Sequence, residues 1–165
     1  MNLILNSKIN YNANNVVAIV VTGNYETSDN SDAGDIMWTI VNDFSSLKTL
    51  FPNIVTCNMT YPDGTSKRVG TKRDLTFEGG DGAITTEELT EVIEMERMGT
   101  YKQLQGLPVT GYTVTYNVMG ESNPVLTWMI NYTDTSSDKE TLATQIVGFF
   151  KGACTQLKTF IENQD

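Results

Sequence analysis

Histidine is missing from the sequence, and cysteine is scarce. Without histidine the chain has no Ser-His or Cys-His nucleophile pair, and it lacks the commonest acid–base side chain of enzymes. Its two cysteines, Cys57 and Cys154, stand far apart and fit no metal-binding or redox spacing, so we expect both to be buried thiols. A metal site would need carboxylates alone, and we predict neither a metal ion nor a cofactor.

Long apolar runs are also absent. No segment approaches the roughly 20 consecutive apolar residues of a membrane-spanning helix. Residues 1–15 hold one apolar triplet, Leu3-Ile4-Leu5, and then become rich in asparagine. They lack the basic region and the cleavage site of a signal peptide. We therefore predict a cytoplasmic protein with no membrane insertion, in which residues 1–15 form a polar N-terminal extension.

Basic residues are few. The 11 lysines and arginines stand against 20 acidic residues, which gives a net charge of −9 and a pI near 4.4. Such a surface repels nucleic-acid phosphates and anionic lipid headgroups, so we predict no nucleic-acid partner. Protein partners stay open. A length of 165 residues suits one domain, and the sequence has neither an internal repeat nor a linker, so we expect a single domain over residues 1–165.

The strongest pattern in the chain is a helical one, over residues 138–162. Apolar residues recur there at steps of three and four, with mostly polar residues between them. The apolar positions are Leu142, Ile146, Phe149, Phe150, Ala153, Leu157, Phe160 and Ile161. This spacing places them on one stripe, which predicts a long amphipathic helix that lies on a core.

The rest of the chain is mostly typical of strands. Residues 16–21 predict a first strand, and a polar run over 26–32 follows it. Two short helices are expected over 36–44 and 47–51, where Pro52 ends the second. Six further strands are expected at 54–61, 68–78, 84–95, 101–104, 112–119 and 125–132. The sequence therefore predicts an α+β fold: a seven-stranded antiparallel sheet curved around the long C-terminal helix, with two short helices after strand 1.

A series of short motifs in a fixed order resembles a known family. The motifs are Ile36-Met37-Trp38 with Asp43-Phe44, Phe51-Pro52 with Cys57, Val69-Gly70-Thr71-Lys72-Arg73-Asp74-Leu75, Glu87-Glu88-Leu89, Tyr101 with Gly106-Leu107-Pro108 and Tyr112, Thr127-Trp128, and Phe149 with Gly152 and Leu157. They resemble the polyketide cyclase/dehydrase-like family, although Glu88 replaces an arginine of its pattern. That family belongs to the START-like, helix-grip superfamily (SRPBCC), which also holds birch-pollen-type allergens and plant abscisic-acid receptors. The resemblance implies a cavity between the sheet and the long helix for an apolar ligand.

One basic and one acidic residue are expected on the inner face of the sheet. Alternation along residues 69–77 carries Arg73 inward together with Leu75, and the same alternation carries Glu87 inward if Leu89 belongs to the core. A buried charge is costly unless it is paired, so the two residues are natural partners. Two interpretations stay open: the pair holds a carboxylate or carbonyl of a ligand, or it is a structural ion pair.

Aromatic residues supply candidate walls for the cavity, although each of them also fits plain core packing. By position, residues 79–82 resemble the gate loop of the plant receptors, and Gly106-Leu107-Pro108 resembles their second, latch-like loop. The candidate ligand-binding residues are Arg73, Phe77, Glu87, Leu89, Tyr101, Leu107, Pro108, Tyr112, Tyr116, Trp128, Ile130, Phe149 and Ala153. Tyr132 is a further candidate for the aromatic wall.

Three functions are compatible with this sequence. The first is binding of a small, mostly apolar ligand (lipid-, polyketide- or hormone-like) in a cavity between the sheet and the C-terminal helix. The alternative is a polyketide cyclase/dehydratase-type enzyme, in which Arg73 stabilises an enolate and Tyr101 or Glu87 moves the proton. The third is a protein-interaction module whose cavity is only a remnant of packing. The sequence does not identify a ligand, because this superfamily includes enzymes, receptors and carriers.

Overall fold

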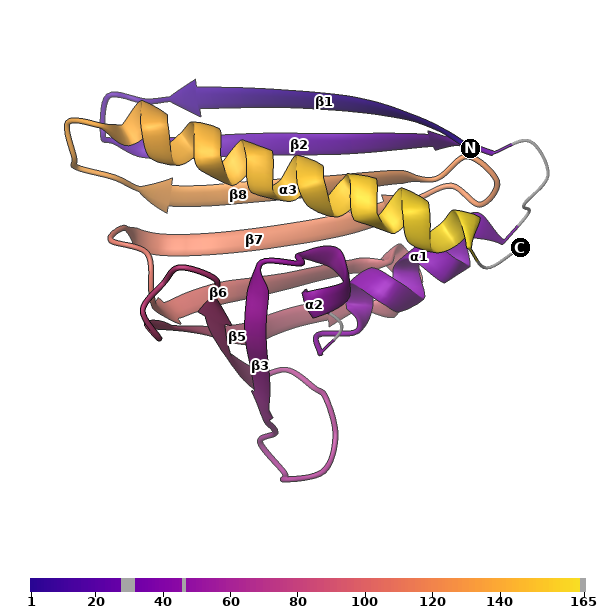
Figure 1. Ribbon diagram of the computed structural model, residues 1–165, viewed down its shortest axis with the longest axis horizontal. Helices are drawn as coiled ribbons and strands as arrows, with labels where there is room; N and C mark the ends of the chain where they lie inside the picture. The colour runs from indigo at the N-terminus through magenta and orange to yellow at the C-terminus, as the bar shows by residue number, and fades with distance from the viewer. Residues whose placement is uncertain (28–31, 46, 164–165) are drawn as a thin grey trace.

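The computed structural model describes residues 1–27, 32–45 and 47–163 (Figure 1). Residues 28–31 of the predicted polar run lie outside this part of the chain. The strands are β1 (Asn2–Tyr11), β2 (Val16–Glu26), β3 (Ile54–Thr60), β4 (Lys72–Phe77), β5 (Ile84–Ile93), β6 (Met98–Gln105), β7 (Thr110–Met119) and β8 (Val125–Thr133). The helices are α1 (Ala33–Asn42), α2 (Leu47–Leu50), a 3₁₀ turn (Glu94–Glu96) and α3 (Lys139–Glu162).

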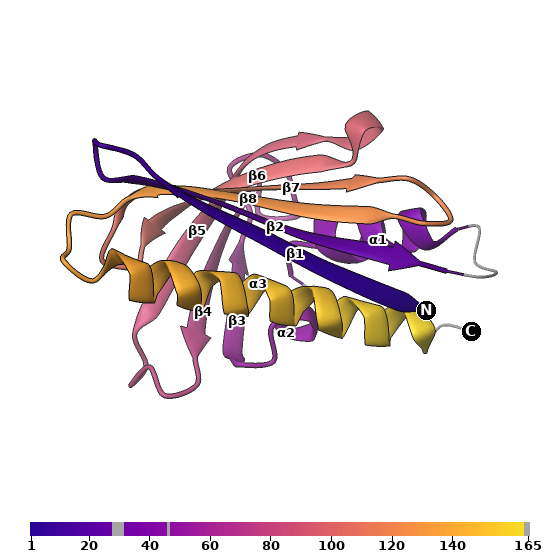
Figure 2. The same cartoon turned by 90° about the horizontal axis from the view of Figure 1, so that it is seen from above.

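One antiparallel sheet forms most of the molecule, and α3 crosses its inner face (Figures 1 and 2). The strand order is β1-β2-β8-β7-β6-β5-β4-β3, so β2 lies next to β8 and the other neighbours follow the chain. The predicted α+β helix-grip fold, its long C-terminal helix and its two short helices after the first predicted strand are confirmed. In the part of the chain that the structure describes, no helix is long and apolar enough to cross a membrane.

The predicted count of seven strands is wrong, because the described residues form a sheet of eight. Residues 2–11 are not a polar extension: they form β1, and all ten of them pair with β2. The reason is that apolar and polar residues alternate along much of this segment. Leu3, Leu5 and Ile9 share one face of the strand and pack against the core, while asparagines and Lys8 occupy the other face. Three apolar residues are enough for an edge strand, since only one of its faces meets the core.

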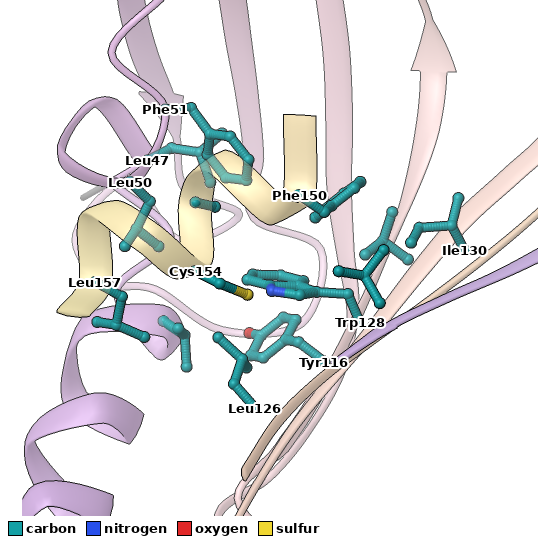
Figure 3. Packing of buried hydrophobic residues seen from close by; sticks show 14 of the residues in the cluster. Leu47, Leu50, Phe51, Tyr116, Leu126, Trp128, Ile130, Phe150, Cys154 and Leu157 are labelled. Carbon is teal, nitrogen blue, oxygen red and sulfur yellow. The ribbon is translucent and has the colours of Figure 1, made fainter. Parts of the chain in front are cut away.

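The core lies between α3 and the concave face of the sheet (Figure 3). Phe150, Cys154 and Leu157 point from the helix toward the sheet, where Trp128 is 2% exposed. The rings of Phe150 and Trp128 lie 5.0 Å apart between centroids. Leu47 and Leu50 of α2 complete the same cluster from the side. The short helix α2 therefore packs beside α3, and the gap between these two helices contains the site described next.

Candidate functional site

A cleft of about 450 Å³ opens between α3 and the segment that links α2 to β3. Its walls come from three segments that are distant in sequence: the end of α2 with the three residues that follow it, the residue after β4, and the middle of α3. The residues that line it are Leu50, Phe51, Pro52, Asn53, Glu78, Gly148, Phe149, Gly152, Ala153 and Gln156. The volume lies within the range of about 300–1,000 Å³ that is usual for small-molecule sites.

Two stacked phenylalanines form the inner wall of this cleft. The rings of Phe51 and Phe149 lie 4.1 Å apart between centroids, with 14° between their planes. Phe51 also meets Phe150 edge-on at 5.7 Å and Trp128 at 6.3 Å. Phe51 is only 2% exposed. It therefore lies between the cleft and the buried Trp128, and the stacked pair separates the open space from the packed interior.

The floor of the cleft contains two glycines of α3, Gly148 and Gly152. They stand four residues apart and so lie on the same side of the helix. Apart from the adjacent residues and the backbone of the helix itself, a Cβ atom added to either glycine would meet no atom within 4 Å. The helix backbone is therefore bare at the cleft, and glycine at these positions leaves open the volume that larger side chains would fill. Each glycine lowers helix propensity by about 1 kcal/mol relative to alanine, so the open floor carries a cost in stability.

The rim of the cleft is polar and carries one charged group. Asn53, Glu78 and Gln156 are all exposed at this rim. The backbone N–H of Glu78 donates to the carbonyl oxygen of Asn53 at 2.8 Å, which fastens the end of β4 to the start of β3. The amides of Asn53 and Gln156 can donate or accept a hydrogen bond, whereas the Glu78 carboxylate only accepts. The local charge of the rim is therefore negative.

Arg73 and Glu87 form a buried ion pair, as the alternation of the sequence predicted. They face each other on β4 and β5 and are 1% and 7% exposed. Arg73 Nε donates to Glu87 Oε2 at 2.6 Å, and Arg73 Nη2 lies 2.5 Å from the same oxygen. Arg73 Nη1 donates to the carbonyl oxygen of Phe44 at 3.2 Å. The guanidinium also lies 3.8 Å from the Phe44 ring centroid and 4.5 Å from that of Tyr101, so aromatic rings enclose it.

The predicted aromatic wall lies on the inner face of the sheet, where its members pack against one another. Tyr116 lies 6.4 Å from Tyr101 and 5.7 Å from Trp128 between ring centroids. Tyr112 lies 5.9 Å from Tyr132. Burial raises the pKa of Tyr101 well above its ordinary value and raises that of Tyr116 to about 12, so both hydroxyls stay protonated at neutral pH.

The predicted site residues thus fall into three groups. Phe149 and Ala153 line the cleft, and Phe77 stands next to it, with its ring 6.1 Å from that of Phe149. Leu107 is half-buried and Pro108 is exposed in the β6–β7 turn. There the Gln103 side-chain amide donates a hydrogen bond to the carbonyl oxygen of Leu107 and accepts one from its N–H. The remaining candidates are buried away from the cleft lining: Arg73, Glu87, Leu89, Tyr101, Tyr112, Tyr116, Trp128 and Ile130.

Sequence reasoning missed most of the residues that line the cleft. Phe51 and Pro52 were noticed as a motif and as the end of a helix, not as a wall. The pattern of α3 held a usable signal, because Gly148 and Gly152 interrupt an otherwise amphipathic helix on one side. A glycine inside a helix needs a packing or functional reason. Glu78 gave no such signal, since only the three-dimensional fold brings it near α3.

Three solved structures resemble this chain closely in fold. The protein XoxI from Bacillus cereus has a TM-score of 0.69 and 24% identity, over 88% of this chain and 96% of that one. Norcoclaurine synthase from Thalictrum flavum, in complex with dopamine and hydroxybenzaldehyde, has a TM-score of 0.67 and 20% identity, over 92% and 90%. Major latex-like protein 151 from Panax ginseng has a TM-score of 0.70 and 16% identity, over 88% and 97%.

These similarities place the chain among the helix-grip folds. This is the fold that the resemblance of the sequence motifs implied. No protein-family profile and no curated protein sequence matches the chain. Identities of this size carry the fold alone, so the function has to be argued from the cleft and its residues.

Proposed function

We propose that this protein binds a small, mostly apolar molecule in the cleft between α2 and α3. The observation that carries the proposal is the form of the cleft: an open volume of about 450 Å³ with a phenylalanine wall, a glycine floor and a polar rim. Apolar walls with a few polar groups at fixed places are the usual composition of a small-molecule site. The lipid-, polyketide- or hormone-like ligands expected from the sequence all fit this description.

The charge of the rim favours neutral or positively charged ligands over carboxylates. Among the described residues that line the cleft, Glu78 alone is charged, and it would repel a ligand carboxylate. Arg73 does not line the cleft, and its guanidinium already bonds Glu87 and the Phe44 carbonyl. A flat ring could stack on Phe149 while Asn53 or Gln156 bonds a hydroxyl or carbonyl at its edge. We therefore infer an uncharged or amine-bearing ligand with at least one planar apolar part.

Binding is a better proposal than catalysis for this cleft. The groups considered for cyclase or dehydratase chemistry were Arg73, Glu87 and Tyr101, and none of them lines the cleft. A general acid or base must come within hydrogen-bond reach of the reacting atom. For these three residues to act on a ligand, the Phe51–Phe149 pair would have to separate. The likeness to norcoclaurine synthase extends to the fold and adds no such opening.

Filling the floor of the cleft tests the proposal. Gly152→Leu places a side chain in space that is open, so the fold should persist while the cleft closes. Thr155→Leu is the matched control, because Thr155 is an exposed residue of α3 outside the cleft lining. The probe is prodan, an uncharged planar naphthalene dye that the negative rim does not repel, followed by its fluorescence and by energy transfer from tryptophan. We expect saturable binding by the parent and by Thr155→Leu, and binding weakened about tenfold or more in Gly152→Leu.

Two results would count against the cleft. If Gly152→Leu binds the dye as tightly as the parent does, the ligand site lies elsewhere. If dye fluorescence rises only when urea unfolds the protein, the native molecule has no apolar site for this probe. Native mass spectrometry of the freshly purified protein adds an independent observation, because a retained small molecule would disappear in Gly152→Leu and stay in Thr155→Leu.

A further inference from the structure

Strand β1 forms one edge of the sheet. It is ten residues long and pairs with β2 in an unbroken register from Asn2 to Tyr11. Along the edge of β1 that faces away from β2, no described strand pairs with it, and both views show this edge uncovered (Figures 1 and 2). An edge strand presents a row of backbone N–H and C=O groups that can pair with another chain. The opposite edge, β3, is shorter, with seven residues, and has a register irregularity between Ile54 and Thr56.

The residues of β1 whose backbone groups point outward can be identified. The N–H of Asn12 donates to the carbonyl oxygen of Val16 at 3.1 Å, so even-numbered residues of β1 face β2. On β2, the N–H of Tyr25 donates to Pro124 beside β8, so odd-numbered residues of β2 face β8 and its even-numbered ones face β1. The two observations agree. The outward-facing residues of β1 are therefore Leu3, Leu5, Ser7, Ile9 and Tyr11.

The usual protections of an edge are weak on β1. Proteins use prolines, bulges, several charged residues or a short edge strand to prevent an edge from pairing with another chain. β1 has no proline and no bulge, and Lys8 is its one charged side chain. Ile4 is 44% exposed and Tyr11 is 41% exposed. Leu5 and Ile9 are half-buried, because the inner face of the sheet ends at this strand. An added strand would cover these apolar side chains.

The charge distribution favours a second copy of this chain as that strand. Each molecule carries a net charge of −9, so most contacts between two copies would bring acidic groups together. β1 and β2 are exceptions. They contain Lys8 and Glu26 as their only charged side chains, and Glu26 accepts a hydrogen bond from Asn2 at 3.0 Å. These two charges cancel, so pairing through β1 adds no net charge at the contact; β3 also has no charged side chain, but that edge is shorter and has a register irregularity.

We propose that two copies of this chain pair through β1, antiparallel, about a two-fold axis at Ser7, and so join two eight-stranded sheets into one. Ser7 is the middle of the five outward-facing residues, so this register uses all of them. Each opposite pair exchanges two hydrogen bonds, which gives about ten across the interface. The pairing is self-complementary, as a two-fold interface requires.

The side chains that this register brings together are compatible. On the inner face, Leu5 lies opposite the partner's Ile9, and Leu3 lies opposite the partner's Tyr11, so apolar residues meet apolar residues. On the outer face, Asn6 lies opposite the partner's Lys8, and the two lysines do not face each other. A shift by one residue would place inner side chains on the outer face, which makes such a register unfavourable.

Proline at Ser7 tests the pairing without disturbing the monomer. The N–H of Ser7 points away from β2, so Ser7→Pro removes no bond within the sheet, yet it removes two donors at the two-fold axis. Ser7→Ala keeps the N–H and is the matched control. Sedimentation velocity should show a concentration-dependent dimer for the parent and for Ser7→Ala. Dimerisation should weaken about tenfold or more in Ser7→Pro, with circular dichroism unchanged and with urea unfolding unchanged at concentrations low enough for the parent to be monomeric.

Disulfide cross-linking tests the register itself. In a Cys57→Ser background, Ser7→Cys should form a covalent dimer under mild oxidation, because opposite Cα atoms in a hydrogen-bonded antiparallel pair lie about 5.5 Å apart, within disulfide range. Asn6→Cys should not, since Asn6 faces the partner's Lys8. A parent that stays monomeric up to about 100 μM overturns the proposal. Cross-linking of Asn6→Cys in preference to Ser7→Cys overturns the register.

Discussion

Replacing Arg73 by methionine should destabilise the protein strongly. The substitution leaves Glu87, which is 7% exposed, as a buried carboxylate without its partner, and breaking a buried ion pair in this way costs about 3–5 kcal/mol. The Phe44 carbonyl oxygen also loses a donor, and two aromatic rings lose their contact with the cation. Methionine fills much of the same volume. We expect a net loss of about 4 kcal/mol in the free energy of unfolding.

The double-mutant cycle separates the ion pair from other effects of each substitution. Glu87→Leu alone leaves the Arg73 cation buried and unpaired, so it should cost a similar amount. Arg73→Met combined with Glu87→Leu removes both charges and should recover most of the loss, because apolar replacement of a buried ion pair is often nearly neutral. Lys72→Met is the control. Lys72 is about half exposed and lies 3.9 Å from Glu88, so its removal should change stability by roughly 1 kcal/mol or less.

Urea unfolding followed by tryptophan fluorescence measures each free energy. For a chain of this length, about 4 kcal/mol corresponds to a drop of roughly 8–16 °C in melting temperature. Dye affinity should stay the same in all variants, since neither residue of the pair lines the cleft. The reasoning fails if Arg73→Met lies within about 1 kcal/mol of the parent, or if the double variant loses the sum of the two single losses. Weaker dye binding at unchanged stability would instead show that Arg73 contacts the ligand.

Other residues give further predictions. Alanine at Gly148 or Gly152 should raise the free energy of unfolding by about 0.5–1 kcal/mol in urea experiments, because its Cβ meets open space; a loss of stability would contradict this. Alanine at Gly99 should lower it by about 1–3 kcal/mol, since the added Cβ would lie 2.3 Å from the Tyr116 ring and hydroxyl; a neutral result would mean that the ring moves freely. Burial raises the pKa of the Cys154 thiol to about 11, so a thiol reagent at pH 8 should label Cys154 only after unfolding, and rapid labelling of the native protein would be inconsistent with its burial. Burial also raises the pKa of Tyr116 to about 12, above the roughly 10 of an unfolded tyrosine, so its contribution to stability is complete below about pH 10 and is lost as pH rises toward 12. Urea titrations across that pH range should show that the free energy of unfolding falls as pH rises. A constant value would contradict this predicted pH dependence.

The fold could be predicted because its elements repeat simple periods. The apolar steps of three and four in residues 138–162 correspond to α3, which runs from Lys139 to Glu162. Alternation along β4 and β5 carried Arg73 and Glu87 to the same face, and their ion pair followed from the cost of burying one charge alone. These inferences needed only local geometry and the rule that buried charges pair.

The missed features depend on contacts that no local pattern contains. The few apolar residues of β1 predict a polar extension. An edge strand meets the core with only one face, however, and Leu3, Leu5 and Ile9 are enough to cover that face. The sequence predicts a cavity between the sheet and α3, where aromatic side chains of the sheet pack against one another, whereas the cleft described above lies between α2 and α3. The open volume depends on how α2 packs beside α3, and it brings Glu78 and Gln156 together from distant parts of the chain.

The position of β2 beside β8 has a consequence for synthesis of the protein. Val16 pairs with Thr133, so β2 finds its partner β8 only after residue 133 has been synthesised. The β1–β2 hairpin can form early from neighbouring residues, but Val17, Ile19 and Val21, which are at most 1% exposed in the native protein, have no cover until β8 and α3 leave the ribosome. A nascent chain that ends before residue 125 therefore displays this apolar face to solvent and to chaperones, and it cannot complete the sheet.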